Sequence, residues 1–174
     1  KHTEFTVVSA MDSRTGHAFD MDRFNRLDWP IQKERIVAFT RKHRGCLILD
    51  ATGAGDPIYD DLVRVCPSIT PFKFTNHSKT ELIQRLIVAV EQKRVFWPSA
   101  WDTLTNEMKR YEYRITSGGQ ITYNAPDGYH DDCVIALALA NKYRQEYAHT
   151  GSMLAIATAL RTPTLQTPRA RLPY

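Results

Sequence analysis

The sequence contains few cysteines, no long apolar segment and no marked excess of either charge. No run approaches the ~18 apolar residues of a membrane span, and the first residues are not typical of a signal peptide. Three scattered cysteines without a C-x-x-C pair exclude a disulfide framework and a zinc ribbon. Lys and Arg number 23 against 19 Asp and Glu, so the net charge of +4 gives little support to a polyanionic partner. With 174 residues, 43% of them hydrophobic, the chain is expected to form an intracellular globular domain that contacts no membrane.

Several catalytic motifs are also missing. The chain has no G-x-x-x-x-G-K-[ST] phosphate-binding loop, no G-x-G-x-x-G after a strand, no H-E-x-x-H and no G-x-S-x-G. Residues 53–55 contain only G-x-G, and no lysine follows where a phosphate-binding loop needs one. ATP hydrolysis by a P-loop mechanism is therefore excluded for this chain.

The pattern of apolar residues predicts an α/β fold. The run Cys46–Leu49 is short and continuously apolar, which is typical of a strand buried on both faces. Ser78 and Glu81 have capping-box spacing at the start of a helix. Helices are expected near residues 29–41, 58–65, 78–92, 101–111 and 131–147, with strands near 5–11, 17–24, 46–49, 69–74 and 95–97 and a hairpin at 113–123. This order predicts a mixed sheet flanked by helices, with an additional β-hairpin.

Asp50 directly follows the predicted buried strand. Open α/β sheets bind ligands at the carboxyl ends of their strands, so a carboxylate there can hold a hard divalent cation. The structural alternative is that Asp50 only organises the turn into residues 51–53.

Asp131 and Asp132 follow His130 at the start of a helix whose first half is almost entirely apolar. Such a helix must pack on the sheet, so its start is expected to project toward a sheet edge. Two carboxylates and an imidazole would converge there, and the two carboxylates would repel each other unless a cation neutralises them. We expect Asp132 to face a metal and Asp131 to be a cap, a water-mediated ligand or a second ligand. The alternative is that both aspartates only cap the helix and interact with its dipole.

Basic residues near these acids could contact phosphate. Lys79 lies at the start of the predicted helix near 78–92, and Lys109, Arg110 and Arg114 flank the predicted hairpin, which is also rich in tyrosine. The alternative for all four is an ordinary solvated surface residue.

Three motifs in order give the chain a resemblance to a known family. They are the segment Ile48–Pro57, the segment Ser78–Ile83 after Phe74, and Gly128–Asp132 before the apolar run Ala136–Ala140. In this combination, residues 3–147 resemble the C-terminal nuclease domain of a tailed-bacteriophage terminase large subunit. The resemblance implies a ribonuclease H-like domain, here assigned to residues 1–161. Residues 162–174 contain three prolines and two arginines with little apolar content, which predicts a basic tail.

The resemblance also implies an activity, which is cleavage of double-stranded viral DNA during genome packaging by an endonuclease that uses two divalent cations, Mg²⁺ or Mn²⁺. Asp50, Asp131 and Asp132 match the family's catalytic and metal-binding acids, and Lys79 matches its Ser-Lys element. His130 would act through a water molecule or by contacting a residue that binds the metal. The implied partners are double-stranded DNA and, in the full protein, an ATPase motor domain, the portal and the small terminase subunit. The implied location is the host cell cytoplasm, outside the mature particle.

One departure leaves other functions open. In the family, a first strand ends in a leading catalytic acid, and that strand is expected to lie outside this chain. Asp12 is in a turn and does not replace this acid. The alternatives are therefore a catalytically dead ribonuclease H-like module that binds DNA or the portal, and a nuclease resembling Holliday-junction resolvases.

Overall fold

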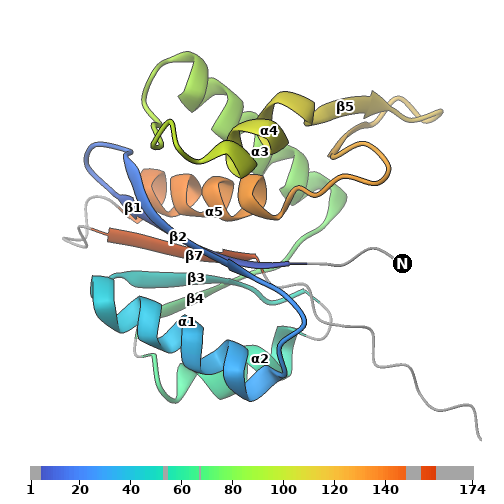
Figure 1. Cartoon of the computed structure of the whole chain (residues 1–174). Helices are drawn as coiled ribbons and strands as arrows, with labels where there is room; N and C mark the ends of the chain where they lie inside the picture. The colour runs from blue at the N-terminus through green and yellow to red at the C-terminus, as the bar shows by residue number, and fades with distance from the viewer. Residues whose placement is uncertain (1–4, 53–54, 67, 148–153, 160–174) are drawn as a thin grey trace, which may run out of the picture.

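The fold has three layers, with a central β-sheet between two layers of helices (Figure 1). The computed structural model describes residues 5–52, 55–66, 68–147 and 154–159. Helices α1 and α2 cover one face of the sheet, and α3, α4 and α5 cover the other. This arrangement agrees with the predicted mixed sheet flanked by helices.

The main sheet has five strands in the order β2-β1-β7-β3-β4. Their bounds are β1 Thr6–Asp12, β2 Ala18–Phe24, β3 Cys46–Asp50, β4 Ile69–Phe72 and β7 Leu154–Ala159. Strand β7 is central; it pairs antiparallel with β1 and parallel with β3, which in turn pairs parallel with β4. The parallel strands β7, β3 and β4 therefore end at the same edge of the sheet.

Five helices and a separate hairpin complete the described structure. The helices are α1 Trp29–His43, α2 Gly55–Val63, α3 Asn76–Glu91, α4 Asp102–Arg110 and α5 Asp132–Tyr147. The hairpin consists of β5 Glu112–Ile115 and β6 Ile121–Asn124, and it extends away from the main sheet (Figure 1). None of the described helices is long and apolar enough to cross a membrane.

Helix α5 is enclosed between the sheet and the helices α3 and α4. Every residue from Asp132 to Asn141 is buried, and Leu137 and Leu139 are fully inaccessible to solvent. An apolar surface on all sides requires burial on all sides, and the sheet, α3 and α4 together provide it. Beneath α5, the small side chains of β7 allow the helix to approach the sheet. The prediction that this helix packs on the sheet is confirmed.

Two local predictions were wrong, and one strand was missed. The capping box of α3 consists of Thr75 and Ser78, because the helix begins earlier than the Ser78–Glu81 spacing implied. The segment 95–97 is not a strand; only Phe96 forms an isolated bridge, with His17, before Pro98 ends any further pairing. Strand β7 was not predicted, because its short Ala-rich sequence fits a helix as well as a strand.

Candidate active site at the carboxyl edge of the sheet

Asp50 is the last residue of β3 and lies at the edge where the parallel strands end. Its Oδ1 accepts a hydrogen bond from the amide of Thr52 at 2.9 Å, so one carboxylate oxygen organises the turn. The Thr52 hydroxyl in turn accepts a bond from the amide of Phe74, just beyond β4, at 2.7 Å. Asp50 is half-buried, and the loops after β3 and β4 are joined directly beside it.

Asp131 is joined to the start of α3 by an ion pair. The Nζ of Lys79 lies 3.2 Å from Asp131 Oδ2 and 2.9 Å from the side-chain oxygen of Asn124 at the end of β6. One lysine therefore connects the acid pair to both α3 and the hairpin. The Asp131 side chain is 8% exposed and that of Lys79 is 21% exposed, so this ion pair is largely shielded from solvent.

Asp132 is the first residue of α5, and its side chain is 3% exposed. The Nδ1 of His130 lies 3.6 Å from Asp132 Oδ2, and the His130 ring packs edge-on against Phe5 with centroids 5.1 Å apart. The structure therefore brings His130, Asp131, Asp132 and Lys79 together, and the contact between Lys79 and Asp131 was not predicted. Helices α3 and α5 both begin on the side of the sheet where β3 ends (Figure 1), and Asp50 is the last residue of β3.

The sequence analysis missed Glu107 on α4. Its side chain is buried, and Oε2 accepts hydrogen bonds from the amides of Cys133 and Val134, at 2.8 and 3.3 Å. Burial raises the pKa of Glu107 against the effect of these bonds, and the nearby negative charge of Asp132 raises it further. One signal could have identified it, because Glu107 lies three residues after Leu104, on the buried side of α4.

The predicted basic residues of the hairpin region are exposed, but two already have partners. Arg114 donates to Glu112 on the same strand, at 2.8 Å, and the Arg110 guanidinium lies 4.6 Å from the centre of the Tyr129 ring. All three cations, including Lys109, are on or beside the segment that extends from the body of the protein. Lys79, by contrast, contacts Asp131 directly.

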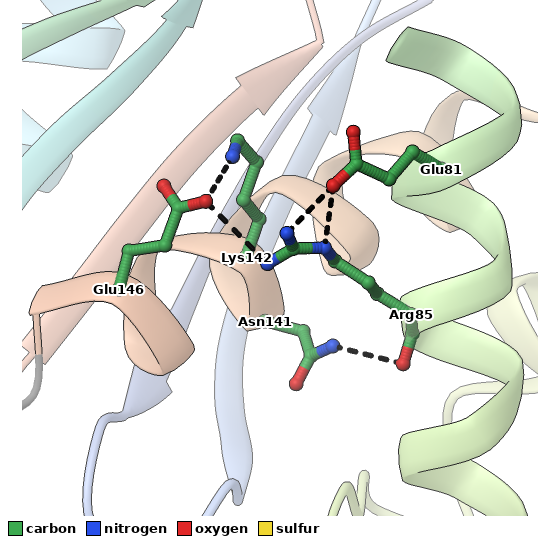
Figure 2. Close-up of polar contacts among 5 residues, drawn as sticks. All are labelled: Glu81, Arg85, Asn141, Lys142 and Glu146. Atoms are coloured by element: carbon green, nitrogen blue, oxygen red, sulfur yellow. Dashed lines mark hydrogen bonds and ion pairs between the residues drawn. The ribbon is translucent and has the colours of Figure 1, made fainter. Parts of the chain in front are cut away.

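The opposite half of α5 is attached to α3 by a network of charged residues. Figure 2 shows Arg85 between two carboxylates, with Glu81 at 2.6 Å and Glu146 at 3.4 Å, while Lys142 also pairs with Glu146. The Asn141 amide reaches the backbone carbonyl of Arg85 at 3.5 Å. This network holds the two helices side by side, far along α5 from Asp132.

The carboxylates at the site have the chemistry that a hard divalent cation requires. Oxygen ligands of this kind suit Mg²⁺ or Mn²⁺, and they come from two places, Asp50 and the pair Asp131 and Asp132. Across the described ranges, no three His, Cys, Asp or Glu side chains form a group that could hold a metal ion. The carboxylate oxygens are thus of the right type for a divalent cation. The described residues alone do not form a complete group of ligands for one.

The central strand adds no acid to this edge. Strand β7 contains only Leu, Ala, Ile and Thr, and Thr158 pairs with Leu49 beside Asp50. Asp12 lies opposite Leu154, at the other end of β7, where it accepts bonds from the amides of Arg14 and Thr15. Asp12 therefore organises the turn after β1, as expected.

A family model described as the terminase RNase H-like domain matches residues 4–143. This chain belongs to the terminase RNase H-like domain family. The terminase large subunit of Thermus virus P23-45 is 30% identical over 142 residues, which cover 80% of this chain and 29% of that protein. The chain thus spans less than a third of the length of this curated relative.

Solved structures place this terminase-family domain in the same fold. The large terminase nuclease of the thermophilic phage G20c with bound magnesium has a TM-score of 0.72 and 28% identity, covering 82% of this chain and 76% of that one. The cobalt-bound form of the same nuclease has a TM-score of 0.73, with 28% identity and the same coverage of both chains. The fold is therefore ribonuclease H-like, and these related nucleases bind divalent metals.

Proposed function

We propose that this terminase-family domain is a metal-dependent endonuclease that cleaves double-stranded viral DNA during genome packaging. The observation that carries the proposal is the placement of three carboxylates in a ribonuclease H-like fold: Asp50 ends β3, Asp131 and Asp132 lie at the start of α5, and Lys79 pairs with Asp131. The metal-bound structures of the related G20c nuclease support the same reading.

Each residue at the edge has a proposed role. Asp50 and Asp132 would hold divalent cations, Mg²⁺ or Mn²⁺ and two in number, with Asp131 as a further or water-mediated ligand. When bound, the cations supply Lewis-acid activation of water and neutralise charge on the scissile phosphate. His130 would orient Asp132 from behind, because its Nδ1 faces that carboxylate. Lys79 would balance the charge of Asp131 and contact a DNA phosphate.

The rest of the packaging apparatus enters as part of the same proposal. Lys109, Arg110 and Arg114 would hold the DNA backbone from the extended hairpin region. In the full protein, the domain would work with an ATPase motor domain, the portal and the small terminase subunit. The place of action would be the host cell cytoplasm, where packaging precedes completion of the particle.

The test is cleavage of supercoiled plasmid in Mn²⁺, in Mg²⁺ and in EDTA, with Asp50→Ala beside the wild type. We expect Mn²⁺-dependent cutting that falls by about a thousandfold or more in the variant, because a carboxylate that holds a catalytic ion is lost. The melting temperature should stay within about 5 °C, since little core volume is removed. Retained cutting by a folded Asp50→Ala variant would contradict the site.

A second candidate is a ribonuclease H-like module that binds DNA without cutting it. The observation that favours it is the partial ligand set, since no described strand adjacent to β3 adds an acid at this edge. DNA binding that persists in EDTA, together with no cutting in Mn²⁺ at any protein concentration, would support this candidate. Cutting that depends on Asp50 would eliminate it.

A further inference from the structure

Glu107 occupies the place of a helix cap, although it comes from another helix. The first amides of a helix have no partner within the helix, and a neighbouring Ser, Thr, Asp or Asn usually accepts from them. Here α5 begins with the carbonyl of Asp131 accepting from Ile135, and the amides of Cys133 and Val134 donate to Glu107. The acceptor lies 26 residues before Cys133 in the sequence, so α4 determines where α5 starts.

This connection fixes the backbone that carries the two acids. Cys133 directly follows Asp132, so holding its amide at 2.8 Å from a buried carboxylate limits how far Asp132 can shift or rotate. Glu107 accepts from these amides, and the side chain of Asp131 pairs with Lys79. The two acids therefore directly precede a backbone segment that Glu107 holds in place.

A second set of contacts also connects Glu107 with Asp132. The Oε1 of Glu107 is buried without a hydrogen-bond partner, and its nearest cation is Arg23 on β2, with Nη2 at 4.0 Å. The Arg23 guanidinium lies 3.2 Å from the centre of the Phe5 ring, and Phe5 packs on His130, which faces Asp132. Glu107 and Asp132 are thus joined both through the start of α5 and through this chain of stacked side chains.

We infer that Glu107 is a positioning residue of the nuclease site, which holds Asp131 and Asp132 in place by capping α5 and contacts neither DNA nor cation. This inference rests on the proposed function and extends it to a residue outside the acid cluster. A buried carboxylate is costly unless it is hydrogen-bonded, and the bonds to the two amides, with Arg23 nearby, offset that cost.

The experiment compares Glu107→Ala with Glu107→Gln, whose carboxamide oxygen can still accept from the two amides. Glu146→Gln is the matched control, because Glu146 lies at the far end of α5 and also binds through its carboxylate. Hydrogen exchange at the amides of Cys133 and Val134 reports the cap directly. Plasmid cutting over a range of Mn²⁺ concentrations reports the placement of the acids.

In Glu107→Ala we expect exchange at these two amides to accelerate by roughly fivefold to tenfold, because the capping bonds are lost. The Mn²⁺ midpoint of cutting should rise by about tenfold to a hundredfold, as for other residues that orient metal ligands. Plasmid binding in EDTA should not change. Glu107→Gln should retain most of the exchange protection and a Mn²⁺ midpoint within about threefold of wild type, and Glu146→Gln should match wild type in both.

A folded Glu107→Ala protein with a wild-type Mn²⁺ midpoint would overturn the inference. Equal loss of cutting in Glu107→Ala and Glu107→Gln, with unchanged exchange at the two amides, would also overturn it. The negative charge of Glu107 would then affect cleavage without capping the helix. If Glu107→Ala does not fold, Glu107→Asp replaces it, and the shorter side chain should give smaller changes in the same directions.

Failure of the proposed function gives a different result. If the wild type does not cut, Mn²⁺ binding measured by calorimetry replaces the cutting midpoint, and weaker binding in Glu107→Ala still supports the positioning role. Equal Mn²⁺ binding by the two proteins overturns it. A wild type that neither cuts nor binds Mn²⁺ overturns both proposals.

Discussion

The two ends of helix α5 both carry charged residues, but the surroundings of these residues differ. At the start, Asp131 and Asp132 are buried; Lys79 and Glu107 approach from two other helices, and His130 directly precedes the pair. At the end, Glu146 is exposed and pairs with the half-buried Lys142 and with Arg85 (Figure 2).

The difference in burial means that charged residues at the two ends contribute differently to stability and to the proposed activity. Exposed ion pairs contribute little to stability, because water and salt screen them. Buried acids cost stability unless other groups compensate, so a fold that retains them gains something else, which here is the proposed catalysis. The following predictions compare the two ends, from the largest expected effect to the smallest.

Asp132→Asn should reduce Mn²⁺-dependent cutting by about a thousandfold, because a neutral amide replaces a proposed cation ligand. Glu146→Gln makes the same chemical change at the other end of the helix and should cut like wild type. Both are measured by plasmid cleavage at saturating Mn²⁺. Similar losses of cutting in the two variants would contradict the proposal that only the start of α5 takes part in cleavage.

Leu137→Ala tests the middle of α5, where the side chain is fully buried. The free energy of unfolding, measured with urea, should fall by about 2–5 kcal/mol, because the substitution leaves a cavity under the sheet-facing helix. Cutting by the remaining folded protein should be close to normal at low temperature. A loss below 1 kcal/mol, on the order of a surface substitution, would mean that α5 is less tightly packed than described.

Lys79→Met should weaken DNA binding and reduce its dependence on salt. If Lys79 contacts a phosphate, the slope of log K against log salt should decrease by about 1 in magnitude. Lys142→Met is the matched control, since Lys142 pairs with Glu146 at the far end of the helix. An unchanged slope in Lys79→Met would restrict this lysine to its ion pair with Asp131.

Glu81→Gln should have the smallest effect, visible only as a change with pH. A hydrogen bond from Arg85 lowers the pKa of the Glu81 carboxyl, so the ionised form stabilises the fold. That contribution is complete above the unfolded pKa of about 4.3 and is lost as the pH falls through the folded value. Wild type should melt at most about two degrees above the variant at pH 7, and the difference should vanish near pH 3. A difference that grows on acidification would contradict the assigned direction.

The sequence located most of the secondary structure because its signals are local. The continuous run Cys46–Leu49 identified a buried strand, and the apolar surface of residues 133–140 identified a buried helix. The same patterns placed Asp50 at the end of that strand and Asp131 and Asp132 at the start of that helix. Parallel strands end at one edge, so the fold class predicts that Asp50 lies where open α/β sheets bind ligands.

The residues that support the site were not predictable in this way. Glu107 looks like any acid on a short helix, and only the packing of α4 against α5 directs it to the amides of Cys133 and Val134. The Ala-rich strand β7 also gave no clear signal, although it occupies the centre of the sheet. The sequence by itself determined at which ends of a strand and a helix the acids lie, because buried strands and helices have continuous apolar runs that can be recognised locally. Only the tertiary structure decided which distant groups hold them, because a contact between remote segments depends on the three-dimensional path of the whole chain.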